Sequence, residues 1–215
     1  MNRKKKYVLF VAILFVMLPV LLVENSSLIE APNQSKIDAR VFRRDMRKLW
    51  EDHSEKTRQL IITTLSDLPN QNETIQNLIQ NQNEIGNAIK PFYGDQTSDE
   101  LSELLKEHTE ISVIMLQAAR KADPKEFEAS VARWYANADE IAEFLQETNQ
   151  ENWPFRKTKP MFRIYLDLTL EEALARWKGD FAASDIAHDK VRTQALEIAD
   201  MLSDGLINRF RRKFK

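Results

Sequence analysis

The sequence contains no cysteine among its 215 residues. Disulfides, thiolate nucleophiles, thiolate-bound zinc, iron–sulfur clusters and lipid attachment through a cysteine are therefore excluded. Glycine is almost as scarce, with four residues that lie far apart in the chain, at Gly86, Gly94, Gly179 and Gly205. Because phosphate-binding loops and dinucleotide fingerprints both need clustered glycines, nucleotide binding by those routes is excluded as well.

The alternation of apolar and polar residues that is typical of strands is also missing after residue 34, where apolar residues recur at helical spacing. Hydrophobic residues make up 43% of the chain and charged residues 30%, which is typical of a folded domain. We therefore predict an all-α protein. An N-terminal transmembrane helix is followed by an up-down bundle of about six helices, arranged as three antiparallel hairpins.

Charge is distributed unevenly along the chain, although the formal net charge is only −2. Arg3, Lys4, Lys5 and Lys6 precede the first acidic residue, Glu24, which leaves 27 basic and 33 acidic residues from that point onward. Five of these basic residues lie in the C-terminal segment RFRRKFK, residues 209–215. An acidic body of this kind argues against nucleic-acid binding.

The strongest local signal is the unbroken apolar run YVLFVAILFVMLPVLLV at residues 7–23. At about 1.5 Å per residue, a helix of this length is near the short limit for crossing a bilayer. A cleaved signal peptide is the alternative, but the run is long for one and no A-x-A-like site follows it. We expect a retained single-pass anchor in the cell membrane, with residues 1–6 in the cytoplasm. Residues 24–34 would then form a linker to an extracytoplasmic helical domain, residues 35–215.

Helix start and stop signals divide that domain. The apolar stripes predict helices at about residues 35–68, 73–90, 97–122, 124–147, 161–177 and 181–212. Thr97 and Glu100 have the spacing of a capping box, and Asp123 followed by Pro124 is typical of a capped helix start. Residues 148–160 are expected to form a longer connection that Trp153 holds against the bundle.

The three predicted hairpins show a weak repeat. When residues are counted outward from each turn, His53 falls beside Asn87, and His108 falls beside Asn137 in the similar segments EIGNAI and WYANAD. Tyr165 takes the corresponding place in the third hairpin, opposite residues 192–194. We interpret this pattern as three related hairpins, with chance similarity as the alternative.

Several strings suggest a known family: DHSEKTR, NQNEIGNAIKPFYG, LLKEH, WYANADEIAEFL, ENWP and IADMLSDGL. Together they resemble small all-helical bacterial proteins whose function is not established, and the resemblance covers most of residues 45–210. It implies a pattern with histidines at the positions of Tyr165, Arg192 and Gln194 and a tyrosine at the position of His188. The resemblance therefore implies the helical fold and no substrate.

The three histidines, His53, His108 and His188, all lie on apolar stripes. One interpretation is a core role, in which Asn87 and Asn137 satisfy buried ring nitrogens across each hairpin. The other is a small-molecule pocket at the same level of the bundle, to which Arg58, Glu107, Asp139 and Glu140 would contribute. The candidate ligand-binding residues are therefore His53, Arg58, Asn87, Glu107, His108, Asn137 and Asp139.

No catalytic residue, metal-ligand set or cofactor is predicted. A ferritin-like di-metal site needs two Glu-x-x-His motifs, and the only acid at that spacing is Asp185 before His188. A metal- or haem-binding bundle that uses His53 and His108, as a carrier or an enzyme, stays open as an alternative.

The C-terminal residues Phe210, Arg211, Arg212, Lys213 and Phe214 interleave aromatic rings with cations, as a membrane-interface segment does. Cations at a helix C-terminus also stabilise the helix dipole, which is the second interpretation. The expected function is a membrane-tethered extracytoplasmic bundle that binds a protein partner or a small ligand. A self-associating scaffold, and hence a homo-oligomer, is a further alternative.

Overall fold

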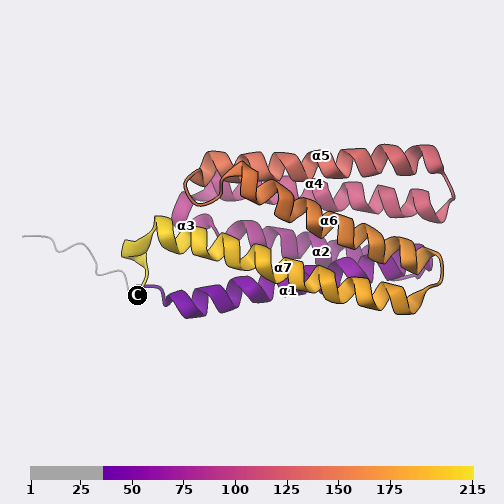
Figure 1. Cartoon of the computed structure of the whole chain (residues 1–215), viewed down its shortest axis with the longest axis horizontal. Coiled ribbons are helices and arrows are strands. Elements are labelled where there is room, and N and C mark those ends of the chain that lie inside the picture. Colours follow the sequence, from indigo (N-terminus) through magenta and orange to yellow (C-terminus); the bar gives the residue numbers. More distant parts are fainter. Residues whose placement is uncertain (1–35) are drawn as a thin grey trace, which may run out of the picture. The chain divides into compact units, whose positions relative to one another are not determined.

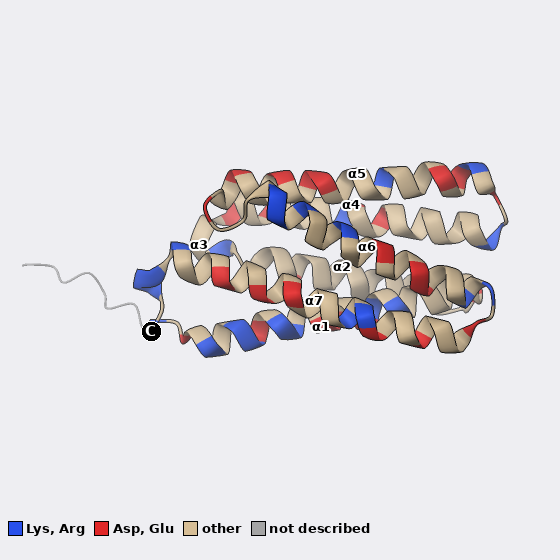
Figure 2. Ribbon diagram, in the orientation of Figure 1, with Lys and Arg blue, Asp and Glu red and all other residues tan. Residues whose placement is uncertain are grey.

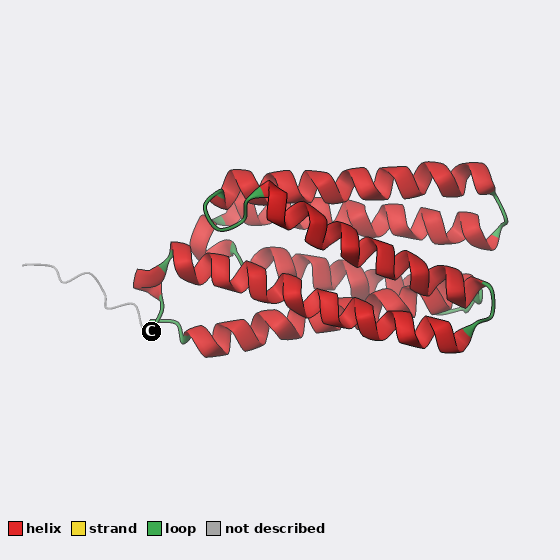
Figure 3. Cartoon of the chain, in the orientation of Figure 1, coloured by secondary structure: helices red, strands yellow, loops and turns green. Residues whose placement is uncertain are grey.

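The computed structural model describes residues 36–215, which form long helices joined by short turns, without strands in this part of the chain (Figures 1 and 3). The elements are α1 (Ala39–Leu65), α2 (Gln71–Asn87), α3 (Lys90–Tyr93), α4 (Asp95–Arg120), α5 (Pro124–Asn149), α6 (Phe155–Trp177), α7 (Phe181–Arg209) and the 3-10 turn η1 (Arg211–Lys213). The all-α prediction is confirmed. The predicted stub, anchor and linker lie outside the described residues. Among residues 36–215, no helix is long and apolar enough to span a membrane.

The long helices run up and down as three hairpins, α1–α2, α4–α5 and α6–α7, whose turns all lie at one end of the bundle (Figure 1). Neighbouring hairpins pack together through α2 with α4 and α5 with α6, and α7 closes the ring against α1. The first helices, α1, α4 and α6, also contact one another. Three alternate helices therefore face the centre, where their apolar stripes form one core.

Two helix starts were predicted from capping signals, and one of them is correct. The Asp123 side chain accepts a hydrogen bond from the backbone N–H of Glu126, at 3.1 Å, and Pro124 is the first residue of α5. Helix α4 instead begins at Asp95, directly after Gly94, whose φ of 84° turns the chain out of α3. Thr97 and Glu100 are therefore helical residues rather than a capping box, because the turn at Gly94 lets α4 begin two residues before Thr97.

The long connection predicted at residues 148–160 is also wrong. Helix α5 continues to Asn149, and α6 begins at Phe155 with Pro160 inside its second turn. A proline inside a helix removes one backbone hydrogen bond and disfavours the preceding turn, but α6 continues through Pro160 as far as Trp177. Trp153 is fully buried in the short loop that remains, as expected, and its indole N–H donates to the carbonyl of Met201 in α7, at 3.3 Å.

The two ends of the described chain meet at the end of the bundle opposite the hairpin turns (Figure 1). Backbone hydrogen bonds join Ile37 N to Lys213 O, at 2.8 Å, and Lys215 N to Ile37 O, at 3.0 Å. Phe214 is buried against Phe42 and Phe92, with ring centroids 5.3 and 5.5 Å away. This packing corrects the membrane-interface prediction for Phe214, because a ring inside the core cannot face lipid.

Candidate functional site

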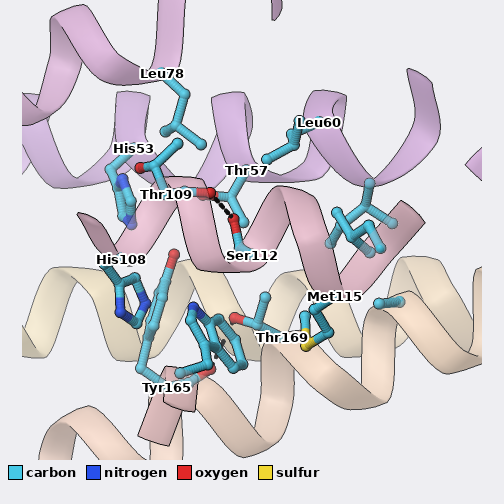
Figure 4. A pocket seen from close by; sticks show the side chains of 14 residues that line it. His53, Thr57, Leu60, Leu78, His108, Thr109, Ser112, Met115, Tyr165 and Thr169 are labelled. Atoms are coloured by element: carbon cyan, nitrogen blue, oxygen red, sulfur yellow. Dashed lines mark hydrogen bonds between the residues drawn. The ribbon is translucent and has the colours of Figure 1, made fainter. Parts of the chain in front are cut away.

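Two of the three histidines singled out in the sequence meet at the centre of the bundle. His53 in α1, His108 in α4 and Tyr165 in α6 point toward one another from the three inner helices (Figure 4). The rings of His53 and Tyr165 are stacked, with centroids 5.7 Å apart. Two enclosed cavities of about 20 Å³ each are lined by all three residues. The repeat in the sequence thus corresponds to three side chains around one polar centre.

The second helix of each hairpin contributes an amide at an equivalent position. Asn81 Nδ2 donates to Leu49 O at 3.0 Å, and Asn137 Nδ2 donates to Leu104 O at 3.2 Å. Gln194 Nε2 donates to Met161 O, also at 3.2 Å. Each of the three carbonyls belongs to the residue four positions before His53, His108 or Tyr165, which is one helical turn away. This shared bond supports the interpretation that the three hairpins are related.

One of the two predicted histidine–asparagine pairs is present. His108 Nδ1 and Asn137 Oδ1 are 2.8 Å apart, whereas His53 Nδ1 lies 3.2 Å from Gln82 Nε2 and not beside Asn87. Asn87 is exposed and accepts from Ser98 Oγ at 3.4 Å. The predicted pairing is wrong because α1 ends at Leu65, three residues before its predicted end, and α2 begins at Gln71, two residues before its predicted start. Together these differences shift the register of the hairpin by five residues.

Burial makes both central imidazoles difficult to protonate. It lowers the pKa of His53 to about 3, with a further contribution from the nearby His108, and it lowers the pKa of His108 to about 4 against a weaker opposing effect of Asn137. Both rings are therefore neutral at pH 7. Because Asn137 Oδ1 accepts, His108 carries its proton on Nδ1. Because Gln82 Nε2 donates, His53 Nδ1 accepts and its proton is on Nε2.

Polar atoms without a hydrogen-bond partner in the described structure gather around the same cavities. They are Thr57 Oγ1, Gln82 Oε1, Tyr165 Oη and the indole nitrogens of Trp50 and Trp134. Each cavity has the volume of about one water molecule, whereas ligand pockets usually measure about 300–1,000 Å³. The polar centre is thus a hydrogen-bonding core of the fold, and its size excludes drug-sized ligands in this conformation.

The remaining predicted ligand residues do not join this centre. Arg58 donates to Glu172 Oε1 at 3.0 Å and is also bonded to Asp185, between α1, α6 and α7. Asp139 is paired with Arg163 and Lys159, and Glu107 is exposed on α4. The predicted pocket of seven residues is therefore wrong, since helical phase places these charges on three separate outer faces.

His188 belongs to the Arg58 network. Glu172, which is only 1% exposed, lies 3.2 Å from His188 Nδ1, and Glu55 lies 3.1 Å from His188 Nε2. Burial opposes the charged ring, but the hydrogen bonds and charges of these two carboxylates outweigh it and raise the pKa of His188. Sequence reasoning missed this cluster because its members come from three helices far apart in the chain.

An apolar groove opens at the turn end of the bundle. It measures about 270 Å³ and lies between the end of α4, the start of α5 and the end of α6. Its walls are Ala118, Ala119, Ala122, Pro124, Phe127, Leu174 and Trp177, with Asp123 as the one charged lining residue. Trp177 is 50% exposed, whereas the other three tryptophans are at most 3% exposed. The signal in the sequence is a large aromatic residue at the very end of a predicted helix.

The comparisons with known proteins add no relative. A scan of protein-family models, a search of curated proteins and a search of solved structures each found no match to this chain. The resemblance suggested by the sequence strings therefore stays a prediction.

Proposed function

We propose that this protein is a membrane-tethered, extracytoplasmic helical bundle that binds an apolar group of a protein partner or small ligand in the groove beside Trp177. The observation that carries the proposal is the apolar lining of the groove, at a volume of about 270 Å³ that is close to the usual range for ligand pockets. Each central cavity has room for about one water molecule, and two larger surface hollows, of about 400 and 500 Å³, are lined by five and four charged residues.

The chemistry of the groove favours an apolar or aromatic group. Three alanines, Ala118, Ala119 and Ala122, leave space between α4 and the flat indole of Trp177. Phe127 and Leu174 supply further apolar surface, and Asp123 at the rim is bonded to the start of α5. Filling such a groove removes apolar surface from water, which stabilises a complex by about 25 cal/mol per Å² before the costs of association.

The groove can be tested in the full-length protein reconstituted in lipid nanodiscs and labelled with 5-fluorotryptophan. Indole is the probe, and the four ¹⁹F resonances report each tryptophan separately. We expect indole to shift the Trp177 resonance and to leave those of the three buried tryptophans unchanged. The substitution Ala119→Leu should abolish the shift, because its added methyl groups occupy the groove.

Ile186→Ala is the matched control, because Ile186 is 60% exposed but does not line the groove. Indole should still shift the Trp177 resonance in this variant. Equal shifts in wild type and A119L would show that the groove is not the binding site. If the Trp177 resonance depends on protein concentration instead, the groove is filled by a second copy and the scaffold alternative is correct.

The tether rests on residues 7–23 and has its own test. After cell fractionation without detergent, the intact chain should sediment with membranes, and protease added outside should degrade the bundle. Deletion of residues 7–23 should move the bundle to the soluble fraction. Recovery of wild-type protein from the medium with a new N-terminus after residue 23 would contradict the tether and indicate a cleaved signal peptide.

A metal-binding role remains the second candidate because His53 and His108 line the same cavities. No described residue bonds Nε2 of either ring. A metal ion would need both Nε2 lone pairs, so His53 would have to move its proton to Nδ1 and lose the bond from Gln82. The cavities are too small for a haem. Co²⁺ titration should produce absorbance bands that disappear in His108→Gln if the site binds metal, and a spectrum without such bands would reject this role.

A further inference from the structure

One end of the described bundle carries a group of exposed cations that we call the basic end: Lys36, Arg209, Arg211, Arg212 and Lys215. None of the five forms an ion pair within residues 36–215. Their neighbours differ in this respect, because Arg43 pairs with Asp204 at 2.7 Å and Arg47 pairs with Asp200 at 2.6 Å. In Figure 2 these cations form the blue region beside the C-terminus. The basic end is thus a positively charged surface whose five cations form no ion pair in the described structure, with Asp38, whose pKa Lys215 helps to lower, as an acidic neighbour.

The tertiary structure holds the basic end in place. Ile37 bonds to the backbone of Lys213 and Lys215, and Phe214 is buried beneath them. Lys213 is also exposed, but its side chain lies against the bundle: Nζ donates to Pro91 O at 2.6 Å and lies 5.6 Å from the ring centroids of Phe92 and Phe210. The backbone that carries these cations is therefore fixed by packing, so binding an anionic surface would cost little backbone entropy.

The chain enters the bundle at Lys36, within the basic end. The following step rests on the proposed tether at residues 7–23. Even fully extended, at about 3.5 Å per residue, residues 24–35 keep Lys36 within about 45 Å of the end of the predicted span. The proposed tether therefore joins the bundle at the basic end and not at the turn end, where the groove lies.

We propose that the basic end binds anionic phospholipid headgroups of the membrane in which the chain is anchored. Cations attract a negatively charged membrane surface, and the attraction falls off within a Debye length, about 8 Å at physiological salt. Close contact is therefore required. Docking in this way would direct the groove beside Trp177 away from the membrane, where a partner can reach it.

Because the chain has no cysteine, a single fluorophore can be attached at one introduced cysteine. Asn208→Cys places it beside the basic end, and Lys121→Cys places it at the turn end. The full-length protein is reconstituted into vesicles of phosphatidylcholine, with or without phosphatidylglycerol, that contain an acceptor dye on headgroups. We expect energy transfer from position 208 to increase with phosphatidylglycerol and to fall to the phosphatidylcholine level at high salt. Transfer from position 121 should not increase.

Two charge variants provide a matched comparison. R211Q/R212Q removes two unpaired cations and should abolish the increase caused by phosphatidylglycerol. R43Q/R47Q removes two cations that are paired with Asp204 and Asp200 and should leave the increase in place. Equal transfer in both lipid mixtures, or equal loss in both variants, would overturn the proposal. The proposal would also be overturned if free polyphosphate removed the increase in energy transfer while R211Q/R212Q responded to phosphatidylglycerol as the wild type does.

The same experiment separates this proposal from the tether. If the protein does not float with the vesicles, the predicted anchor fails. If it floats but energy transfer from position 208 does not respond to phosphatidylglycerol, the anchor holds and the lipid-binding surface fails.

Discussion

Two kinds of buried histidine occur in this bundle, and they respond to protons in opposite ways. His108 is held by a neutral amide, so burial determines its charge and lowers its pKa to about 4. His188 is also buried, but two carboxylates face it and raise its pKa. The surroundings of a histidine, and not its burial alone, thus decide whether its charged form is stabilised.

This difference predicts opposite pH effects on stability. The neutral His108 contributes stability above its unfolded pKa, about 6.5, and that contribution is lost as pH falls toward 4, by about 2 kcal/mol at pH 5. The raised pKa of His188 contributes stability that is fully present below about pH 6.5 and is lost as pH rises through the folded pKa.

The measurement is urea unfolding of wild type, His108→Gln and His188→Gln at pH 5 and pH 8. The loss of stability in H108Q should be smaller at pH 5 than at pH 8, and the loss in H188Q should be larger at pH 5. A loss of the same size at both pH values in either variant would contradict the corresponding assignment.

At the scale of helices, the loop between α5 and α6 is attached to α7 at a glycine. Gly205 allows the Trp153 indole to lie directly on the helix backbone, and a Cβ at this position would overlap the ring. Asn149 Nδ2 also donates to Gly205 O, at 3.1 Å. The absence of a side chain therefore sets the distance between α7 and the loop, although the glycine has an ordinary helical conformation.

We expect Gly205→Ala to destabilise the fold by about 1–3 kcal/mol, because Trp153 must move from its fully buried position. Thermal unfolding of G205A, W153L and the double variant would measure the coupling between the two positions. The smaller leucine should reduce the penalty of the added methyl group, so the double variant should lose less than the two single losses combined. Additive losses would mean that the indole does not limit this position.

The elements themselves follow largely from local signals. The cap formed by Asp123, the proline after it and the apolar stripes predict α4, α5 and α7 closely, because hydrogen bonds and contacts within a few residues determine them. The errors occur where a local rule met tertiary packing. Pro160 suggested a boundary, yet α6 begins five residues before it, at Phe155, and Gly94 rather than Thr97 is the N-cap of α4.

At the scale of the whole molecule, the two ends of the bundle differ in chemistry. The turn end presents an apolar groove and the half-exposed Trp177, whereas the other end presents unpaired cations over a buried aromatic cluster. Phe214 joins the last residues of the chain to that cluster. The tail is therefore part of the folded core and not an independent membrane-binding peptide.

This placement predicts separate roles for neighbouring tail residues. Phe214→Ala should lower the free energy of unfolding by about 3 kcal/mol, because the buried ring leaves a cavity between Phe42 and Phe92. R211Q/R212Q should change it by less than about 0.5 kcal/mol, because both side chains are exposed. Chemical denaturation measures both values, and a small effect of F214A would mean that the ring does face lipid or solvent.

The sequence alone determines that residues 36–215 are helical, that they form hairpins and that His53, His108 and Tyr165 occupy equivalent inward positions, because periodicity and capping are local properties. Only the tertiary structure decides which groups meet across helices. Helix α1 ends three residues earlier than predicted and α2 begins two residues earlier, and together these shifts replace Asn87 with Gln82 beside His53. Closure of the ring by α7 likewise brings Arg58, Glu172 and His188 together. The groove beside Trp177 is also decided only by the tertiary structure, since its walls come from helices of two hairpins that pack against each other.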